Sequence, residues 1–213
     1  MKSYYIHFIR HGTISETKRG AYIGVTDPDL SQEGKEELKK LDTTHKYPYA
    51  PVIFTGPLKR CTQTCEILYP GVTPLVIDEL TEMNFGLWEG KTADELKDDS
   101  LFQRWLAGEK GVTPPKGESN DDFIRRMCLV FQNIVDGLIK TGNTDCAIIT
   151  HSGVMNTLLA VYGIPQAKPF DWACDNGFGY SMRVTPMLWQ RDRVAEVYKL
   201  IPEEREEDYD AEI

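Results

Sequence analysis

The chain of 213 residues is 41% hydrophobic and 27% charged, a globular composition that excludes a wholly disordered or collagenous protein. Its formal charge of −9 lacks the basic excess that a nucleic-acid binder needs, so we expect no nucleic-acid partner. No apolar run approaches the roughly 18 residues of a membrane span, and the N-terminus has no secretory signal. We therefore expect a cytoplasmic protein with no membrane partner.

The five cysteines form an odd set without a CxxC pair, which indicates reduced thiols. Cys61 and Cys65 lie four residues apart, on one face of a predicted helix. Since the chain has only four histidines, we favour buried structural thiols over a zinc site.

The first half of the chain predicts strands that alternate with helices. Ser31 begins the first helix as its cap, and the helix ends before the sequence Tyr47-Pro48. The second helix begins at Gly56-Pro57, with Pro57 in its first position. Short apolar runs predict strands at residues 4–9, 52–54 and 75–77, and the helices are predicted from 31 to before 47 and from 57 to about 68.

The stretch from residue 84 to residue 116 is the least regular part, and we expect it to form a small lid or insertion. It contains one predicted short helix near residues 92–105. The second half then predicts a long helix after residues 119–122, with one apolar face that ends at Leu138. A buried strand at 146–150 precedes a helix that ends at Gly163. The segments at 180–184 and 194–198 predict a terminal hairpin around a polar turn at 190–193.

Strands that alternate with helices indicate an α/β protein with a mostly parallel sheet. We expect a single domain over residues 1–202 and a flexible acidic tail over residues 203–213. Whether the protein is a monomer or a homodimer stays open.

Ligands of such sheets bind beyond the carboxyl ends of the strands. The residues expected there are Arg10, His11, Arg60, Glu82 and His151, which come from distant parts of the sequence. Neutral imidazole is a nucleophile near neutral pH, and a guanidinium group matches the oxygens of a phosphate. A carboxyl group with a raised pKa can protonate a leaving oxygen. These residue types together indicate phosphoryl transfer.

Several motifs resemble the histidine phosphatase superfamily, which includes the cofactor-dependent phosphoglycerate mutases. The matching segments are Arg10-His11-Gly12, residues 22–34, residues 56–64, residues 80–90, Gly117-Glu118-Ser119 and Thr150-His151-Ser152-Gly153. The resemblance implies a three-layer α/β/α fold of the phosphoglycerate mutase type with a small lid insertion. It also implies a phosphatase that needs no metal and no cofactor and acts on a small phosphorylated metabolite.

The resemblance assigns a role to each matching residue. His11 is expected to become phosphohistidine, and Arg10, Arg60 and His151 are expected to hold the phosphoryl oxygens. Glu82 is expected to act as general acid and then as general base. Thr17, Gly24 and Ser152 are expected to bind the substrate. Thr13 and Thr17 depart from the family pattern, which commonly has Glu and Asn at these positions.

Three readings of the function remain open. The Trp88-Glu89 pair resembles the α-ribazole phosphatase and broad-specificity phosphatase branches, so we favour a phosphomonoesterase. A cofactor-dependent phosphoglycerate mutase is the alternative within the same fold. A phosphate-binding module with weak catalysis is the alternative outside enzymes. Glu79 and Glu89 lie close to Glu82 in the sequence, and only the motif spacing selects Glu82 as the acid, for which we expect a raised pKa.

Overall fold

The computed structural model describes residues 2–15 and 18–205. Its centre is a seven-stranded sheet in the order β4-β3-β5-β1-β7-β8-β6. The strands are β1 (Tyr4–Arg10), β3 (Val52–Thr55), β4 (Leu75–Val76), β5 (Asp145–Thr150), β6 (Gly163–Ile164), β7 (Gly179–Val184) and β8 (Ala195–Ile201). Strand β7 is antiparallel to both of its neighbours, whereas every other pair in this sheet is parallel. The prediction of a mostly parallel sheet is therefore confirmed.

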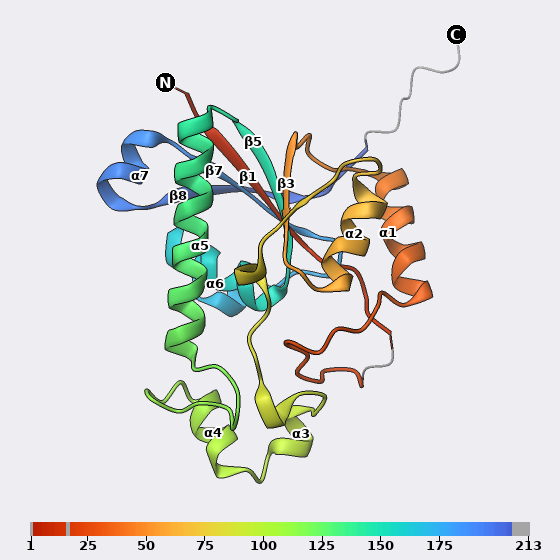
Figure 1. Ribbon diagram of the computed structural model, residues 1–213, viewed down its shortest axis with the longest axis vertical. Helices are drawn as coiled ribbons and strands as arrows, with labels where there is room; N and C mark the ends of the chain where they lie inside the picture. The colour runs from red at the N-terminus through yellow and green to blue at the C-terminus, as the bar shows by residue number, and fades with distance from the viewer. Residues whose placement is uncertain (1, 16–17, 206–213) are drawn as a thin grey trace.

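Helices cover both faces of this sheet, which confirms the three-layer α/β/α architecture (Figure 1). Helices α1 (Gln32–Thr44) and α2 (Lys59–Leu68) cover one face, and α5 (Asn120–Thr141) and α6 (Ser152–Tyr162) cover the other. Alternating side chains of β1 pack on opposite faces of the sheet. Ile6 and Phe8 belong to the core under α5 and α6, and Ile9 belongs to the core under α1 and α2. Burial on both faces explains why β1 is mostly apolar.

The helix ends follow local capping chemistry. Ser31 accepts a hydrogen bond from Gly34 N and caps α1, as predicted. Helix α2 begins at Lys59, two residues after Pro57, so the prediction that Pro57 is its first residue is wrong. The reason is a long-range cap: the backbone N–H of Lys59 donates to Asp27 Oδ1 at 2.7 Å.

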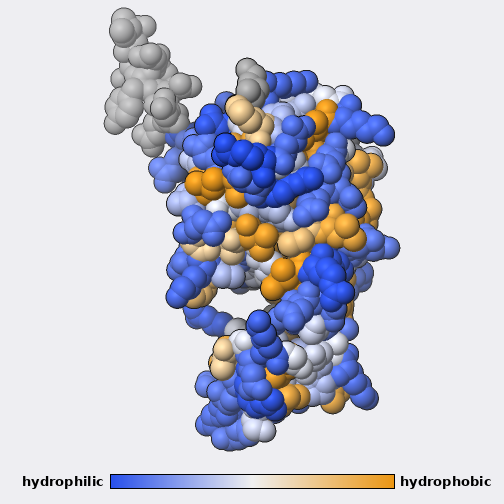
Figure 2. Space-filling model, turned by 90° about the vertical axis from the view of Figure 1, so that its left-hand side faces the viewer, coloured by the Kyte–Doolittle hydropathy of each residue, from blue (hydrophilic) through white to orange (hydrophobic). Residues whose placement is uncertain are grey.

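The insertion contains two short helices, α3 (Ala93–Leu96) and α4 (Ser100–Leu106), where the sequence predicted one. Asp99 separates them, because its carboxylate accepts hydrogen bonds from the first N–H groups of α4. Trp88, Leu96 and Phe102 are buried and form a small core of their own. The insertion lies beyond the carboxyl ends of the central strands (Figure 1), and Figure 2 shows a hollow between it and the sheet-bearing body.

Strands β7 and β8 pair as the predicted hairpin, but α7 (Pro186–Asp192) connects them instead of a polar turn. Trp189 explains the helix: its side chain is buried, and its indole N–H donates to Asp136 Oδ1 at 3.1 Å. Arg193 ends α7 in the left-handed conformation, with φ of 53°.

A second, two-stranded sheet pairs β2 (His45–Lys46) with β9 (Glu203–Glu204). The first two residues of the expected acidic tail thus form a strand, and residues 206–213 lie outside the described part. Short 3-10 helices complete the fold at Asp78–Leu80 (η1), Gly86–Trp88 (η2) and Pro169–Trp172 (η3). Among the helices of the described residues, each is too short or too polar to cross a membrane. Cys61 and Cys65 are free and buried, as predicted.

Candidate active site

Five predicted site residues converge at the carboxyl ends of β1 and β5. Arg10 ends β1 and His11 follows it, Arg60 lies in the first turn of α2, Glu82 follows η1, and His151 caps α6. His11, Arg60, Glu82 and His151 are all buried, with exposed fractions of 9%, 1%, 6% and 1%. The rings of His11 and His151 lie 5.1 Å apart between centroids. The structure therefore brings together residues that are up to 141 positions apart in the chain.

The ring of His11 has a defined tautomer. Its Nδ1 lies 2.7 Å from Gly12 O, a carbonyl that can only accept a hydrogen bond, so Nδ1 carries the hydrogen and Nε2 keeps its lone pair. Burial lowers the pKa of His11 to about 3, and the cations Arg60 and Arg10 add to this effect against the opposing Gly12 hydrogen bond. The ring is therefore neutral at physiological pH, and its Nε2 is able to attack an electrophile.

The ring of His151 has the opposite arrangement. Arg60 Nε donates to His151 Nδ1 at 3.1 Å, so the hydrogen of the neutral ring resides on Nε2. Burial lowers the pKa of His151 well below its usual value, and the nearby His11 and Arg60 contribute further. Cys61 Sγ lies 3.5 Å from Nε2. His151 thus presents an N–H donor, whereas His11 presents a lone pair.

The two arginines differ in how much of their donor capacity the protein uses. Arg60 donates from Nη1 to Thr26 O and from Nη2 to Gly24 O, both at 2.7 Å, in addition to its bond to His151. Arg10 donates from Nη1 to Cys174 O at 2.6 Å. Within the described residues, Arg10 Nε is buried without a hydrogen-bond partner. An unpaired donor of this kind is costly unless a ligand accepts from it, and an oxyanion suits a guanidinium group best.

The segment before β7 supports the site, which the sequence did not indicate. Cys174 supplies the carbonyl that orients Arg10, and Asn176 Nδ2 donates to His11 O at 2.7 Å. Both contacts join residues more than 160 positions apart. A backbone carbonyl has no sequence signature, so no pattern could have identified Cys174.

Glu82 is buried and accepts two backbone hydrogen bonds. Its Oε1 accepts from Met83 N and its Oε2 from Gly153 N, each at 2.9 Å. Burial raises the pKa of Glu82, while those two hydrogen bonds and the charges of Arg60 and Arg126 oppose the rise. The net direction is the one predicted from the sequence, and it suits a general acid near neutral pH.

Glu89, a competing candidate for the acid, is saturated with donors instead. Its carboxylate accepts hydrogen bonds from the backbone N–H groups of Gly24, Val25, Thr26 and Phe85, at 3.0–3.3 Å. The Thr26 hydroxyl donates to Oε2 at 2.6 Å. Glu89 is therefore arranged to hold the 24–26 loop.

Glu79 and Thr13, which the sequence analysis also considered, lie outside the cluster of site residues. The side chain of Glu79 is exposed. The Thr13 hydroxyl donates to Glu37 Oε2 at 2.9 Å, so it is directed toward α1.

Three residues, Thr17, Gly24 and Ser152, were expected to bind the substrate, and the result differs for each. Thr17 lies outside the described residues. Gly24 is engaged by the protein through both backbone groups, and a Cβ added there would lie 1.8 Å from Met83 O. Ser152 begins α6 and is half-buried. Among residues 2–15 and 18–205, no group of three His, Cys, Asp or Glu side chains is placed to hold a metal ion.

Comparison with known proteins identifies relatives of this chain. The sequence model of the histidine phosphatase superfamily (branch 1) matches residues 6–196. The chain is 27% identical to phosphoserine phosphatase 1 of Hydrogenobacter thermophilus, over 79% of this chain and 81% of that protein. It is 25% identical to the adenosylcobalamin/alpha-ribazole phosphatase of Salmonella typhimurium, over 79% and 85%. The alpha-ribazole phosphatase structure from Shigella flexneri shares the fold, with a TM-score of 0.77 at 21% identity over 92% and 95% of the two chains.

Proposed function

This chain belongs to the histidine phosphatase superfamily, and we propose that it is a phosphomonoesterase that forms a phosphohistidine on His11. The observation that carries the proposal is the pair of opposite tautomers. His11 keeps the Nε2 lone pair, and the ring of His151, whose centroid lies 5.1 Å from that of His11, carries its hydrogen on Nε2. A nucleophile beside a hydrogen-bond donor suits attack on a phosphorus whose oxygens gain charge.

The proposed reaction has two steps, and Glu82 loses a proton in the first and regains one in the second. In the first, His11 Nε2 attacks the phosphorus, the bond to the ester oxygen breaks, and Glu82 gives its proton to the leaving alcohol. In the second, the Glu82 carboxylate takes a proton from water, the oxygen attacks the phosphohistidine, and phosphate leaves Nε2. Arg10, Arg60 and His151 donate hydrogen bonds to the phosphoryl oxygens, where the charge of the transition state accumulates.

The proposed reaction uses side chains as its cations, so we propose that it is independent of metals. Arg10 supports this, because its buried Nε has no protein partner among the described residues and matches a phosphoryl oxygen. Of the two other readings, the binding module predicts phosphate binding without a phosphoenzyme. The mutase predicts phosphoryl transfer between metabolites.

Two observations favour hydrolysis over mutase activity. Arg104 of the insertion pairs with Glu109, and Lys18 pairs with Glu95, so carboxylates already neutralise these cations. A mutase must bind a second acidic group of its substrate, which requires further cations. A mutase assay on 3-phosphoglycerate with a bisphosphoglycerate primer should give less turnover than hydrolysis, and the opposite ratio would overturn this choice.

The substrate class is a small phosphorylated metabolite. The names of the relatives suggest two probes, phosphoserine and α-ribazole phosphate. A preference for one of these by orders of magnitude would identify a dedicated enzyme, and a flat profile over simple esters would identify a broad-specificity phosphatase.

The direct test is hydrolysis of p-nitrophenyl phosphate in the presence of excess chelator. Wild type should turn over, and His11→Ala should lose turnover. His45→Ala is the matched control, because His45 lies at the end of α1 and should leave turnover unchanged. Turnover that survives His11→Ala would overturn the nucleophile assignment, and turnover that the chelator abolishes would overturn metal independence.

A further inference from the structure

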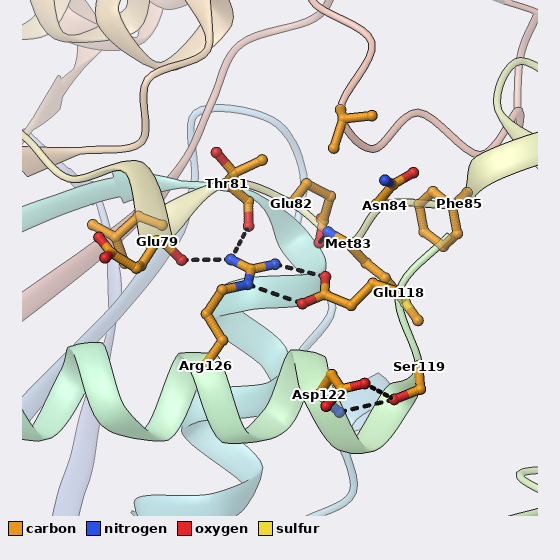
Figure 3. Close-up of polar contacts among 12 residues, drawn as sticks. Glu79, Thr81, Glu82, Met83, Asn84, Phe85, Glu118, Ser119, Asp122 and Arg126 are labelled. Carbon is orange, nitrogen blue, oxygen red and sulfur yellow. Dashed lines mark hydrogen bonds and ion pairs between the residues drawn. The ribbon is translucent and has the colours of Figure 1, made fainter. Parts of the chain in front are cut away.

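The segment that carries Glu82 has little regular structure to hold it. We define the acid loop as residues Glu79–Asn84, of which only the first two residues belong to η1. A general acid must lie within hydrogen-bond reach of its leaving oxygen, so the loop needs an external support. Figure 3 shows where that support comes from: the loop lies across the first turns of α5.

Arg126 of α5 makes the principal contact with the acid loop. Its Nη1 donates to Glu79 O at 2.5 Å and to Thr81 O at 2.8 Å, directly before Glu82 (Figure 3). The opposite edge of the guanidinium group donates from Nε and Nη2 to the two carboxylate oxygens of Glu118, at 3.0 and 2.7 Å. The side chains of Arg126 and Glu118 are 23% and 17% exposed. Solvent therefore weakens this pair less than it weakens a surface ion pair.

Glu118 holds the other end of the same loop. Its backbone N–H donates to Asn84 O at 2.8 Å. The approach is close, since a Cβ added to Gly117 would lie 2.5 Å from that carbonyl oxygen. Three carbonyls of the loop, two before Glu82 and one after it, are thus bound by one arginine and its ion-pair partner.

We propose that Arg126, oriented by Glu118, is a positioning residue that holds the Glu82 carboxyl group in place for proton transfer to the leaving group. This inference rests on the proposed function. Only a planar guanidinium group can donate to two carbonyls along one edge and to a carboxylate along another. A lysine at position 126 would keep the charge and lose this geometry.

Arg126 also has an electrostatic effect that a purely mechanical support would lack. The charged groups that act on Glu82 are Arg60 of α2 and Arg126 of α5, and the Gly153 N–H at the start of α6 faces its carboxylate. The Arg126 charge lowers the pKa of Glu82. Its removal should therefore raise that pKa, so the alkaline limb of kcat/KM, where the acid loses its proton, should move to higher pH.

The test compares two substrates that differ in the basicity of their leaving group. Phenyl phosphate and p-nitrophenyl phosphate share the ring, but phenolate needs protonation more than the stabilised p-nitrophenolate does. Breakdown of the phosphohistidine is common to both substrates and does not enter kcat/KM, so kcat/KM is the quantity compared. For Arg126→Met we expect kcat/KM on phenyl phosphate to fall by about 10- to 100-fold, which is a part of the roughly 100- to 10,000-fold that a general acid contributes. The value for p-nitrophenyl phosphate should stay near wild type.

Four further variants complete the design. Arg125→Met removes the neighbouring exposed arginine, whose ion pair with Asp122 lies on the surface, and it should behave as wild type. Arg126→Lys should lose turnover of phenyl phosphate and keep the pH limb in place. Glu118→Gln keeps Arg126 but weakens its orientation, so it should show the same substrate selectivity to a smaller degree. This variant tests the positioning role even if Arg126→Met does not fold. Glu82→Gln should show the full selectivity.

The outcomes separate this inference from the proposed function. An equal loss on both substrates in Arg126→Met and Glu118→Gln, or an Arg126→Met that matches Arg125→Met, would overturn the positioning role alone. Turnover of phenyl phosphate that does not depend on His11 and Glu82 would overturn the proposed function, and the positioning role with it. Selective loss on phenyl phosphate with a raised alkaline limb would support both.

Discussion

The replacement Glu89→Gln should loosen the loop that holds Arg60. Glu89 accepts hydrogen bonds from four backbone N–H groups and one hydroxyl, and three of these N–H groups belong to residues 24–26. The carbonyls of Gly24 and Thr26 in turn accept from Arg60. Glutamine keeps one acceptor oxygen but turns an NH₂ group toward donors that need an acceptor.

The size of the effect follows from the hydrogen bonds that the amide group can no longer accept. If the amide oxygen takes the Oε1 position, the Gly24, Val25 and Phe85 N–H groups keep an acceptor, at 3.1 Å each. The Thr26 hydroxyl can rotate to accept from the new NH₂ group, so about one charge-assisted hydrogen bond, from the Thr26 N–H, disappears. Such a bond contributes about 1.5–3 kcal/mol. For a chain of this length, that corresponds to a fall of about 3 to 12 °C in the unfolding midpoint.

Thermal unfolding and inhibition by inorganic phosphate measure the two consequences. Glu89→Gln should unfold at lower temperature and bind phosphate more weakly, because the Arg60 support has moved. Glu109→Gln is the matched control, since that carboxylate of the insertion pairs with Arg104 on the surface, and its midpoint should match wild type. An unchanged midpoint together with unchanged phosphate inhibition in Glu89→Gln would refute the reasoning.

Two further predictions concern pH and backbone space. Burial lowers the pKa of His7 to about 4 and of His11 to about 3, and it also lowers that of His151. Since the folded values lie below the unfolded value near 6.5, the unfolded chain takes up protons first as the pH falls. The free energy of unfolding should therefore decline below pH ~6.5, by about 2 kcal/mol per imidazole at pH 5. In denaturant titrations, His7→Gln should remove about one third of this dependence on pH. An unchanged dependence in this variant would contradict buried histidines as the cause. Gly153→Ala should abolish turnover that needs the proposed acid, because the new Cβ would lie 2.4 Å from Glu82 Oε1. Gly137→Ala, which has open space in α5, should keep activity and gain about 0.5–1 kcal/mol of stability.

The sequence was most informative where a pattern depends on nearby residues. Strands β1 and β5, which were predicted from apolar runs, end directly before His11 and His151, so the common edge of a parallel sheet placed these residues together. The apolar face from Phe123 to Leu138 likewise became the buried side of α5. Periodicity and strand direction are local properties, and they survive folding.

The features that the sequence did not reveal depend on distant contacts. Asp27 displaces the start of α2, and buried Trp189 turns a predicted turn into α7. The motif spacing selected Glu82 over Glu89, but the burial and the backbone donors that distinguish the two carboxyl groups come from other segments. Cys174 contributes only its carbonyl. Backbone groups are the same in every residue, so only the tertiary structure reveals such roles.

The most direct test of the central claim is the identity of the phosphorylated residue. Wild-type protein mixed with substrate, quenched rapidly at alkaline pH and digested should carry one phosphoryl group on the peptide that contains His11. With p-nitrophenyl phosphate, whose leaving group depends little on the acid, the Glu82→Gln variant should accumulate more of this species, because its second step lacks a base. A phosphoryl group on another residue, or turnover with no phosphorylated peptide in either protein, would contradict the account.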